Sequence, residues 1–353
     1  MSSAERIRVL VRSPTDPDHV TEVASEELAP WLGDGRLAAW IDISHPGDRA
    51  AVLLRDVLRL GPLAVEDCLT PQRMPQYDFL PDGEAFLAVF AVHLDGEDAG
   101  EEGDGPRLRP LEVDFVVGRG YLVTVVDPRV GDVPPAAPVA APEPAAALEA
   151  RVTARLRTEP ADAGRGGAIG AALAGAALDA LVDSHLPALV RAAAAAERLE
   201  DRLDPLAESV SLAALDRLIV LRRDLLAFRR QAVAQQEVLA RLARLAPELG
   251  AALSDMGDTE REALALVDAT RDYIDGAVEA YRIRRDERTA GDVRRLTVLA
   301  TVLGAVSVLS GLWGVNFRDI PGTEHPLGFP VFVAVQVTLV LLAVRYLRRR
   351  RLL

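Results

Sequence analysis

The stretch LTVLATVLGAVSVLSGLWGV, residues 296–315, decides the fold because it is twenty residues long and contains no charge. At 1.5 Å of rise per residue, a helix of this length spans about 30 Å, the thickness of the hydrocarbon core of a bilayer. A second stretch, LGFPVFVAVQVTLVLLAV at residues 327–344, is also uncharged, although Gln336 and Thr338 interrupt it. The eleven residues between the two stretches are too few for a domain. We therefore expect a helical hairpin that spans the lipid bilayer.

The arginines around this hairpin predict its orientation. Arg294 and Arg295 precede the first span, and Arg345 and Arg348–Arg351 follow the second, whereas the connecting loop holds only Arg318. By the positive-inside rule both termini are cytoplasmic and the loop is external. The opening residues, MSSAERIRVL, are too polar for a signal peptide. We therefore predict a multi-pass protein of the plasma (inner) membrane that carries a large cytoplasmic domain.

Composition excludes several classes of function. The chain has 40 basic and 53 acidic residues, a formal net charge of −13, so it lacks the basic surface of a nucleic-acid-binding protein. No glycine-rich phosphate loop is present, and no lysine exists to complete one, which argues against a nucleotide partner. The sequence also lacks a nucleophile elbow and a paired-histidine zinc motif, so we do not expect an enzyme. A single cysteine, Cys68, excludes a disulfide framework.

The cytoplasmic part divides into an α+β domain and a helical stalk. Alternating apolar residues predict strands in the first part, at 7–12, 38–43, 86–93 and 112–126. The Pro/Ala-rich residues 134–149 are typical of a linker. The stalk contains helical segments at 168–203, 211–245 and 258–315.

The last of these helices carries the strongest implication for assembly. It starts at the signal Asp258-Thr259-Glu260 and meets no proline before Pro321, so it is about 85 Å long and continues into the first span. A helix of this length cannot bury its apolar stripe alone, so we expect an oligomer. The predicted boundaries are 1–165 for the α/β domain, 166–295 for the stalk, 296–316 for the first span, 317–326 for the external loop, 327–347 for the second span and 348–353 for the basic tail.

The external end of the first span carries the clearest functional motif, Gly314-Val315-Asn316, with the only asparagine of the chain. Glycine lets backbones approach closely, and an asparagine amide exposes a carbonyl oxygen. A ring of such groups suits a strongly hydrated cation, because it can hold the hydration shell without removing it. Mg²⁺ loses its water reluctantly, so this motif favours Mg²⁺.

With these motifs the sequence resembles the CorA-like divalent-cation transporters along nearly its whole length. Residues 314–317 and 328–331 are similar to the GMNF…GYPV segment of that family, and Arg348–Arg351 to its basic C-terminus. In the cytoplasmic domain, Trp40-Ile41-Asp42, Pro62–Asp67 and Gln72–Pro75 resemble the family's WI(D/N), HPL-x-x-ED and QRPK segments.

The resemblance implies a homopentameric, funnel-shaped channel whose pore is lined by five copies of the first span. The selectivity ring maps onto Asn316, with Gly314 and Val315 beside it. Further pore positions, including a narrow hydrophobic throat, map onto Val293, Leu296, Gly304 and Ser307. The carboxylates through which the family senses intracellular Mg²⁺ map onto Glu66, Asp67, Asp179 and Asp255. Loss of the bound ion would leave these carboxylates to repel one another and would favour opening.

Simpler interpretations of the carboxylates stay open. Glu66 and Asp67 could cap a helix that begins near Cys68, and Asp255 could be another helix start signal. Asp179 lies on an otherwise apolar face, where a structural explanation is harder to find.

Departures from the family pattern bear on the identity of the ion. Val315 replaces the usual methionine, and Gly322 stands in place of the acidic residue of the loop, which leaves Asp319 and Glu324 as the external carboxylates. Ile320-Pro321-Gly322 resembles the zinc-transporting branch, for which His325 would be the external ligand, whereas Phe317-Arg318-Asp319 is closer to the magnesium branch.

We therefore predict uptake of Mg²⁺, with Co²⁺ and Ni²⁺ as related cargo, under the control of intracellular Mg²⁺. Proton-coupled transport of Zn²⁺ is the alternative. A membrane-anchored scaffold that conducts no ion is a third hypothesis, because long stalk helices with two anchors would also serve that role.

Overall fold

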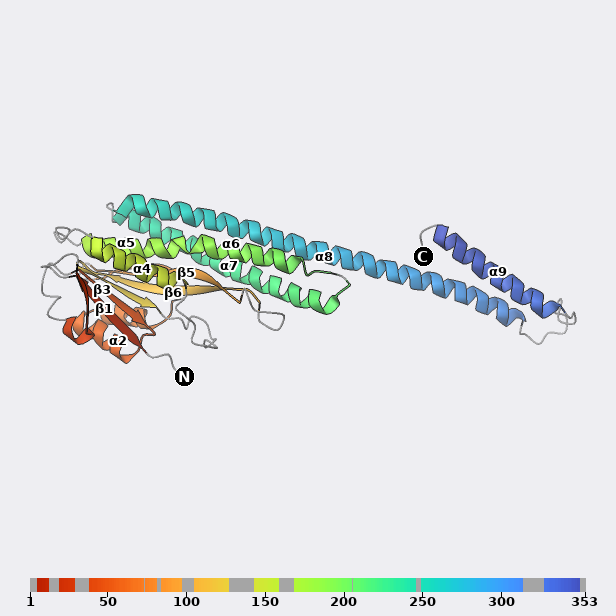
Figure 1. Cartoon of the computed structure of the whole chain (residues 1–353), viewed down its shortest axis with the longest axis horizontal. Helices are drawn as coiled ribbons and strands as arrows, with labels where there is room; N and C mark the ends of the chain where they lie inside the picture. Colours follow the sequence, from red (N-terminus) through yellow and green to blue (C-terminus); the bar gives the residue numbers. More distant parts are fainter. Residues whose placement is uncertain are drawn as a thin grey trace. The chain divides into compact units, whose positions relative to one another are not determined.

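The structure is a computed structural model of the 353-residue chain, drawn in Figure 1. Its elements fall into two compact units, Met1–Gly276 and Ala277–Leu353. The structure describes residues 5–12, 19–28, 38–72, 74–80, 84–96, 105–126, 143–158, 168–204, 206–245, 249–313 and 327–349.

The first unit is built on a seven-stranded sheet with the order β2-β1-β3-β7-β6-β5-β4. Strand β3 pairs with β7 in parallel, and the other five neighbouring pairs are antiparallel. The strands are β1 (Arg6–Arg12), β2 (Val20–Val23), β3 (Ala38–Ser44), β4 (Gln76–Phe79), β5 (Ala85–Asp95), β6 (Arg107–Val117) and β7 (Tyr121–Val126).

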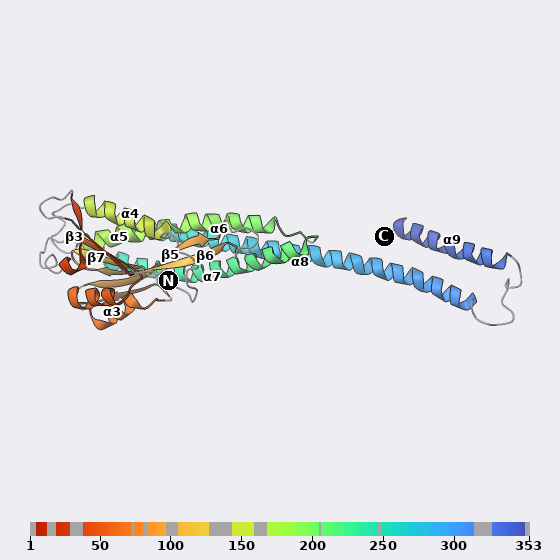
Figure 2. The same cartoon turned by 60° about the horizontal axis from the view of Figure 1, so that its bottom comes forward.

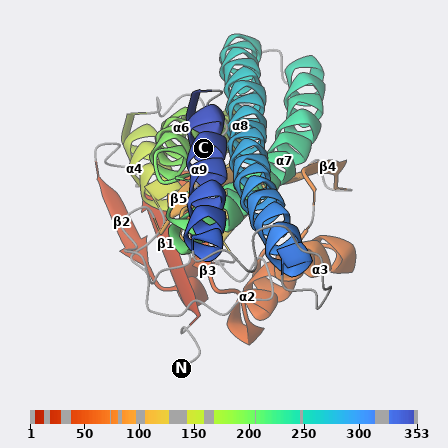
Figure 3. The same cartoon turned by 90° about the vertical axis from the view of Figure 1, so that its right-hand side faces the viewer.

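Alternation along the strands gives the sheet two apolar faces, because successive side chains point to opposite sides. On β1, Val9 and Val11 join one core cluster and Leu10 joins the other; on β3, Ile41 and Trp40 divide in the same way. One face packs against helices α2 (Asp48–Val52) and α3 (Pro62–Leu69), with a π-helical turn at Leu53–Val57 between them. The other face is covered by a layer of longer helices (Figures 2 and 3).

That layer contains most of the helical residues of the first unit. Its members are α4 (Glu143–Thr158), α5 (Ala168–Asp183), α6 (His185–Glu200), α7 (Glu208–Leu245) and the first part of α8 (Gly250–Trp313). A short 3-10 helix, Ser25–Glu27, follows β2, and α9 (Gly328–Arg349) lies in the second unit. The predicted fold class is confirmed: an α+β domain, a long helix and apolar helices near the C-terminus.

Several predicted elements were wrong in extent. Residues 112–126 form two strands rather than one, because the chain reverses at Gly118, whose N–H donates to the Tyr121 carbonyl at 3.0 Å. The predicted linker contains the start of α4, whose Leu148 and Val152 pack in the core. Segment 168–203 divides at Ser184 into α5 and α6, and α8 begins at Gly250 rather than Asp258.

Burial separates the apolar helices of the core from those that suit a membrane. The apolar window within Ile169–Glu200 is 61% buried, which is expected of core helices, whereas that within Gly250–Gly311 is 0% buried. A shorter apolar helix, Gly328–Ala343, belongs to α9. The membrane hairpin predicted from the sequence therefore corresponds to the C-terminal part of α8 and to α9.

Candidate ion pathway and regulatory carboxylates

The candidate pathway lies on α8, a single helix of 64 residues whose last charged residue is Arg295. The described part of α8 extends to Trp313, and Gly314-Val315-Asn316 follow it in the sequence, outside the described residues. Glycine and alanine in the span reduce the bulk of the helix, and the threonines Thr297 and Thr301 donate to carbonyls of their own helix at 2.8 Å, so their hydroxyls need no external partner.

The four described residues predicted to line the pore are all exposed in the single chain. Val293 and Leu296 are 56% and 65% exposed, and Gly304 and Ser307 are exposed as well. Their spacing of three, eight and three residues keeps them on one side of a helix with 3.6 residues per turn. The opposite side carries Val298, Val302 and Val306, which are partly buried at intervals of four residues.

Helix α9 accounts for that burial within the second unit. Phe332, Gln336 and Val340 are partly buried on α9, again at intervals of four residues, and Gln336 hydrogen-bonds to α8. The face of α8 that contains the predicted pore positions is therefore left free by α9. Predicted residues Gly314, Val315, Asn316, Asp319, Glu324 and His325 lie outside the described residues, as do loop residues 317–326.

The four predicted regulatory carboxylates do not meet within one chain. Glu66 and Asp67 lie in the last turn of α3, on one face of the sheet, whereas Asp179 on α5 lies on the other face. The capping interpretation of Glu66 and Asp67 is wrong, since α3 begins at Pro62. Asp255 is not a start signal either, since α8 begins five residues earlier.

Asp179 and Asp255 do line one common cavity of about 460 Å³, together with Arg151 of α4. Arg151 donates to Asp179 at 2.7 Å and to Asp183 at 3.0 Å. Burial and the neighbouring Asp183 raise the pKa of Asp179, while Arg151 opposes the shift and Asp255 adds to it. The Arg151 guanidinium therefore already offsets the negative charge of Asp179 and Asp183.

A regulatory metal therefore lacks a complete set of ligands in the single chain. Among the described residues there is no group of three or more His, Cys, Asp or Glu side chains that could hold a metal ion. Partial burial and the negative charges of Asp78 and Glu66 raise the pKa of Asp67, because both effects disfavour its ionised form. Neither group by itself fits a resident divalent cation.

Three of the softer candidate ligands for zinc, Cys68, His93 and His185, are engaged elsewhere in the fold. Cys68 is buried in α3, and burial raises the pKa of its thiol, so the thiolate that binds zinc is disfavoured. His185 is 1% exposed and occupied in a buried polar network. Nε2 of His93 lies 3.3 Å from Oδ1 of Asp95 at the end of β5.

The buried network of His185 connects α8 to the rest of the first unit. Gln235 of α7 donates to Glu260 of α8 at 2.9 Å and accepts from the Phe90 N–H of β5 at 2.8 Å. His185 Nε2 lies 3.1 Å from the Phe90 carbonyl, which can only accept, so this nitrogen carries the proton and donates. Nδ1 of the same ring lies 3.3 Å from Glu260 Oε1.

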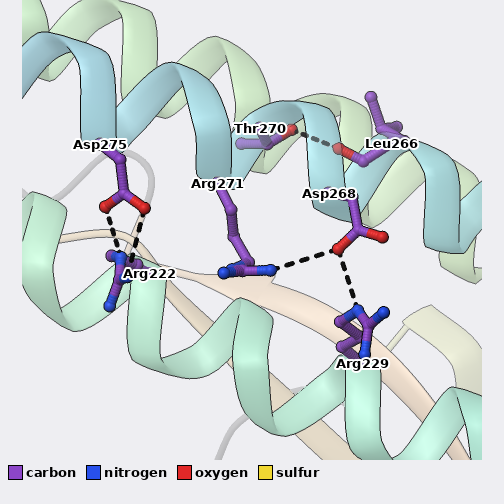
Figure 4. Close-up of polar contacts among 7 residues, drawn as sticks. All are labelled: Arg222, Arg229, Leu266, Asp268, Thr270, Arg271 and Asp275. Carbon is purple, nitrogen blue, oxygen red and sulfur yellow. Dashed lines mark hydrogen bonds and ion pairs between the residues drawn. The ribbon is translucent and has the colours of Figure 1, made fainter.

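A second set of polar contacts lies along α7 and α8 (Figure 4) and is more exposed than the His185 network. Arg222 makes a two-pronged contact with Asp275, at 2.6 and 3.2 Å. Arg229 of α7 and Arg271 of α8 both donate to Asp268, at 2.9 and 3.2 Å. Arg271 thus bonds within α8, to the same carboxylate that Arg229 of α7 reaches.

Sequence reasoning missed Arg151, Gln235 and Glu260 as partners of the predicted groups. A weak signal existed for Glu260, an acidic residue within an apolar helical pattern, but the sequence placed it in a helix start. Arg151 gave no signal, because no helix was predicted around it and the predicted linker, residues 134–149, covered the start of α4. Trp40 and Asp42, in contrast, belong to a recognised motif, and the structure joins them through Thr124 at 3.0 and 2.8 Å.

Known proteins share both the sequence pattern and the fold. The profile of the family described as CorA-like Mg²⁺ transporter protein matches residues 37–349. YfjQ of Bacillus subtilis (strain 168), itself assigned by inference as a metal ion transporter, is 25% identical over 311 residues, 86% of each chain. The zinc transport protein ZntB of Photorhabdus laumondii is 32% identical over 145 residues, 38% of this chain and 42% of ZntB.

The fold of nearly the whole chain is similar to that of a solved structure. The structure of the CorA magnesium transporter from Methanocaldococcus jannaschii matches with a TM-score of 0.73, covering 99% of both chains at 18% identity. At this identity the likeness shows the fold. Together with the family match over most of the sequence, it establishes that the chain belongs to the CorA-like Mg²⁺ transporter family of divalent metal cation transporters.

Proposed function

We propose that the protein takes up Mg²⁺ through a pore lined by the C-terminal part of α8, in a homopentamer. One observation carries the proposal: α9 covers the valine face of α8 and leaves Val293, Leu296, Gly304 and Ser307 exposed on the other face. Neighbouring copies that pack around these residues would enclose a path of small and apolar side chains that ends at Asn316. Co²⁺ and Ni²⁺ are related cargo.

The membrane potential supplies the driving force for this uptake. A divalent cation that enters a negatively charged interior gains about 4.6 kcal/mol per 100 mV, twice the value for a single charge. The arginines that flank the two spans favour cytoplasmic termini and an external Asn316 motif. Hydrated Mg²⁺ would then meet the ring of amide oxygens before it enters the pore.

Intracellular Mg²⁺ is proposed to regulate this pathway from sites between subunits. Glu66 and Asp67 lie on one face of the sheet and Asp179 on the other, so a shared ion would require the neighbouring chain. A cation there would offset the repulsion between the carboxylates and favour the closed state.

Proton-coupled Zn²⁺ transport is the second candidate, favoured by the 32% identity to ZntB over 145 residues. The positions of the softer side chains argue for Mg²⁺ instead. Cys68 is buried in α3 and His185 is held in a buried network, so neither is available to bind zinc along α8.

The substitution Asn316→Ala tests the proposed selectivity ring. We expect Mg²⁺ influx into proteoliposomes to fall to the level of protein-free vesicles, because alanine supplies no oxygen toward the hydrated ion. Size-exclusion chromatography of the variant in detergent should show the same oligomer as the parent protein. Unchanged influx from a correctly assembled variant would remove Asn316 from the pathway, and absence of influx from the parent protein would favour a scaffold.

A further inference from the structure

Gln336 is an unusual residue for the middle of α9. It lies in an uncharged stretch, residues 327–344, where the neighbours along the helix are Val335 and Val337. Its Nε2 donates to Ser310 Oγ at 2.7 Å and to the Val306 carbonyl at 3.4 Å, both on α8. A polar amide without a partner in hydrocarbon costs several kcal/mol, so a bond across to the other helix satisfies a strong requirement.

Other polar side chains of the two helices behave differently. Thr338 of α9 donates to the Ala334 carbonyl of its own helix at 2.7 Å, and Thr297 and Thr301 of α8 do the same with carbonyls four residues earlier. These bonds place no constraint on how α8 and α9 face each other. The Gln336 bond does, because its donor and acceptors lie on different helices.

Apolar packing alone does not define the rotation of α8. Leu299 and Leu303, which are 54% and 57% exposed, lie on one side of the helix, and Val308, which is 64% exposed, lies on another side. Lipid tails are as apolar as these side chains, so turning one leucine away and another toward lipid changes the free energy little. A polar contact at one position is what distinguishes one rotation from the next.

The contacted Val306 lies on the side of α8 away from the predicted pore positions, and Ser310 lies between that side and the predicted pore face, about 60° around the helix from Ser307. At about 100° per residue, Val306 and Gly304 are separated by about 160° around the helix axis. A rotation by one residue would replace Gly304 and Ser307 on the free face with bulkier side chains such as Leu303 and Val306. Ser310 lies three residues before Trp313, so its contact with Gln336 holds the last described turn of α8.

We propose that Gln336 is a positioning residue for ion transport, which holds α8 in the rotation that turns Gly304 and Ser307 toward the pore. The inference rests on the proposed function, because it assumes that these residues line an ion pathway. Gln336 itself does not touch the ion. It acts through Ser310 and the Val306 carbonyl.

Cysteine accessibility measures this rotation directly. In full-length protein with Cys68→Ala, Ser307→Cys reports the free face and Val302→Cys the face toward α9. With a small, charged thiol reagent we expect faster modification at position 307 than at position 302. Adding Gln336→Leu should reduce the ratio of the two rates by about three- to tenfold, the range that an interhelical hydrogen bond in a membrane supports.

Matched variants separate a lost hydrogen bond from general damage. Ser310→Ala removes the acceptor and should repeat the effect of Gln336→Leu, whereas Ser310→Thr keeps a hydroxyl and should restore the parent ratio. Thr338→Val removes a polar side chain of α9 that bonds only within its own helix, so it should leave the ratio unchanged. Each variant is first checked for the parent oligomer by size-exclusion chromatography.

Two results would overturn the inference: an unchanged ratio in Gln336→Leu, or equal rates at positions 302 and 307 in the parent background. Influx of Mg²⁺ into proteoliposomes is recorded in parallel. Accessibility that depends on Gln336 in protein without influx would contradict the proposed function and retain the helix rotation. Mg²⁺ influx in protein whose cysteine accessibility does not depend on Gln336 would support the proposed function and contradict the positioning role of Gln336.

Discussion

At the scale of single residues, Arg151 is the clearest departure from what the family resemblance implies. Its guanidinium bonds to Asp179 and Asp183 beside the cavity that Asp255 also lines. A Mg²⁺ ion that reaches Asp179 must therefore compete with a cation that is covalently part of the chain. The strength of regulation by Mg²⁺ should depend on this arginine.

The substitution Arg151→Gln should make the cytoplasmic domain more responsive to Mg²⁺. We expect the Mg²⁺ concentration that gives half-maximal protection from chymotrypsin to fall by up to about fivefold, since an exposed ion pair contributes at most about 1 kcal/mol. Arg191→Gln is the matched control, because Arg191 bonds to Glu143 at 2.7 Å. An unchanged or higher midpoint in Arg151→Gln would show that Arg151 does not compete with Mg²⁺.

At the scale of elements, the first part of α8 is joined to the rest of the first unit by two sets of polar contacts that differ in burial. The His185–Glu260 pair is 1% and 0% exposed, whereas Arg222 and Asp275 are 37% and 47% exposed. Removing one partner of a buried pair leaves an uncompensated polar group without water, and exposed pairs are screened by solvent. The buried contacts of Glu260 therefore stabilise the fold more than the exposed pair of Arg222 and Asp275.

Substitution of each set by alanine should give unequal losses of stability. We expect Glu260→Ala to lower the free energy of unfolding by about 1–3 kcal/mol, because it leaves the buried Gln235 amide without its acceptor, and Arg222→Ala by about 1 kcal/mol or less. Denaturant unfolding of the full-length protein in detergent, followed by circular dichroism, measures both. Comparable losses in the two variants would contradict the assignment of Glu260 to a buried, stabilising network.

The same contacts explain which elements could be predicted from the sequence. Long uncharged runs and alternating strands specify their own structure, so the membrane helices and the strand at 38–43 could be found. Asp258-Thr259-Glu260 looked like a helix start because local polarity is all that a sequence shows. In the fold, Glu260 is buried against Gln235 and His185, partners 25 and 75 residues away, and tertiary contacts override the local signal.

The candidate site was predictable to a similar degree. Exposure of Val293, Leu296, Gly304 and Ser307 on the free face of α8 agrees with the pore that the resemblance implies, and their role stays a prediction. What the sequence could not provide was the partner of each polar group. Arg151 meets Asp179, and Gln336 meets Ser310, only because two helices pack side by side.

At the scale of the whole molecule, we propose that the free face of α8 conducts Mg²⁺ under the membrane potential. Zinc transport and a silent anchor would use the same fold. Neither the helix nor its cover by α9 distinguishes among these functions. The driving force and the ion do, because a channel for Mg²⁺ responds to voltage and a proton-coupled carrier responds to a pH gradient.

The most direct test is cation influx into proteoliposomes that contain the full-length protein, with Mg²⁺ and Zn²⁺ reporters used in parallel. An inside-negative potential is imposed first, and a pH gradient without a potential second. We predict Mg²⁺ influx that follows the potential and does not respond to the pH gradient. Zn²⁺ influx stimulated by the pH gradient without Mg²⁺ influx, or no influx of either ion through correctly assembled protein, would contradict the claim.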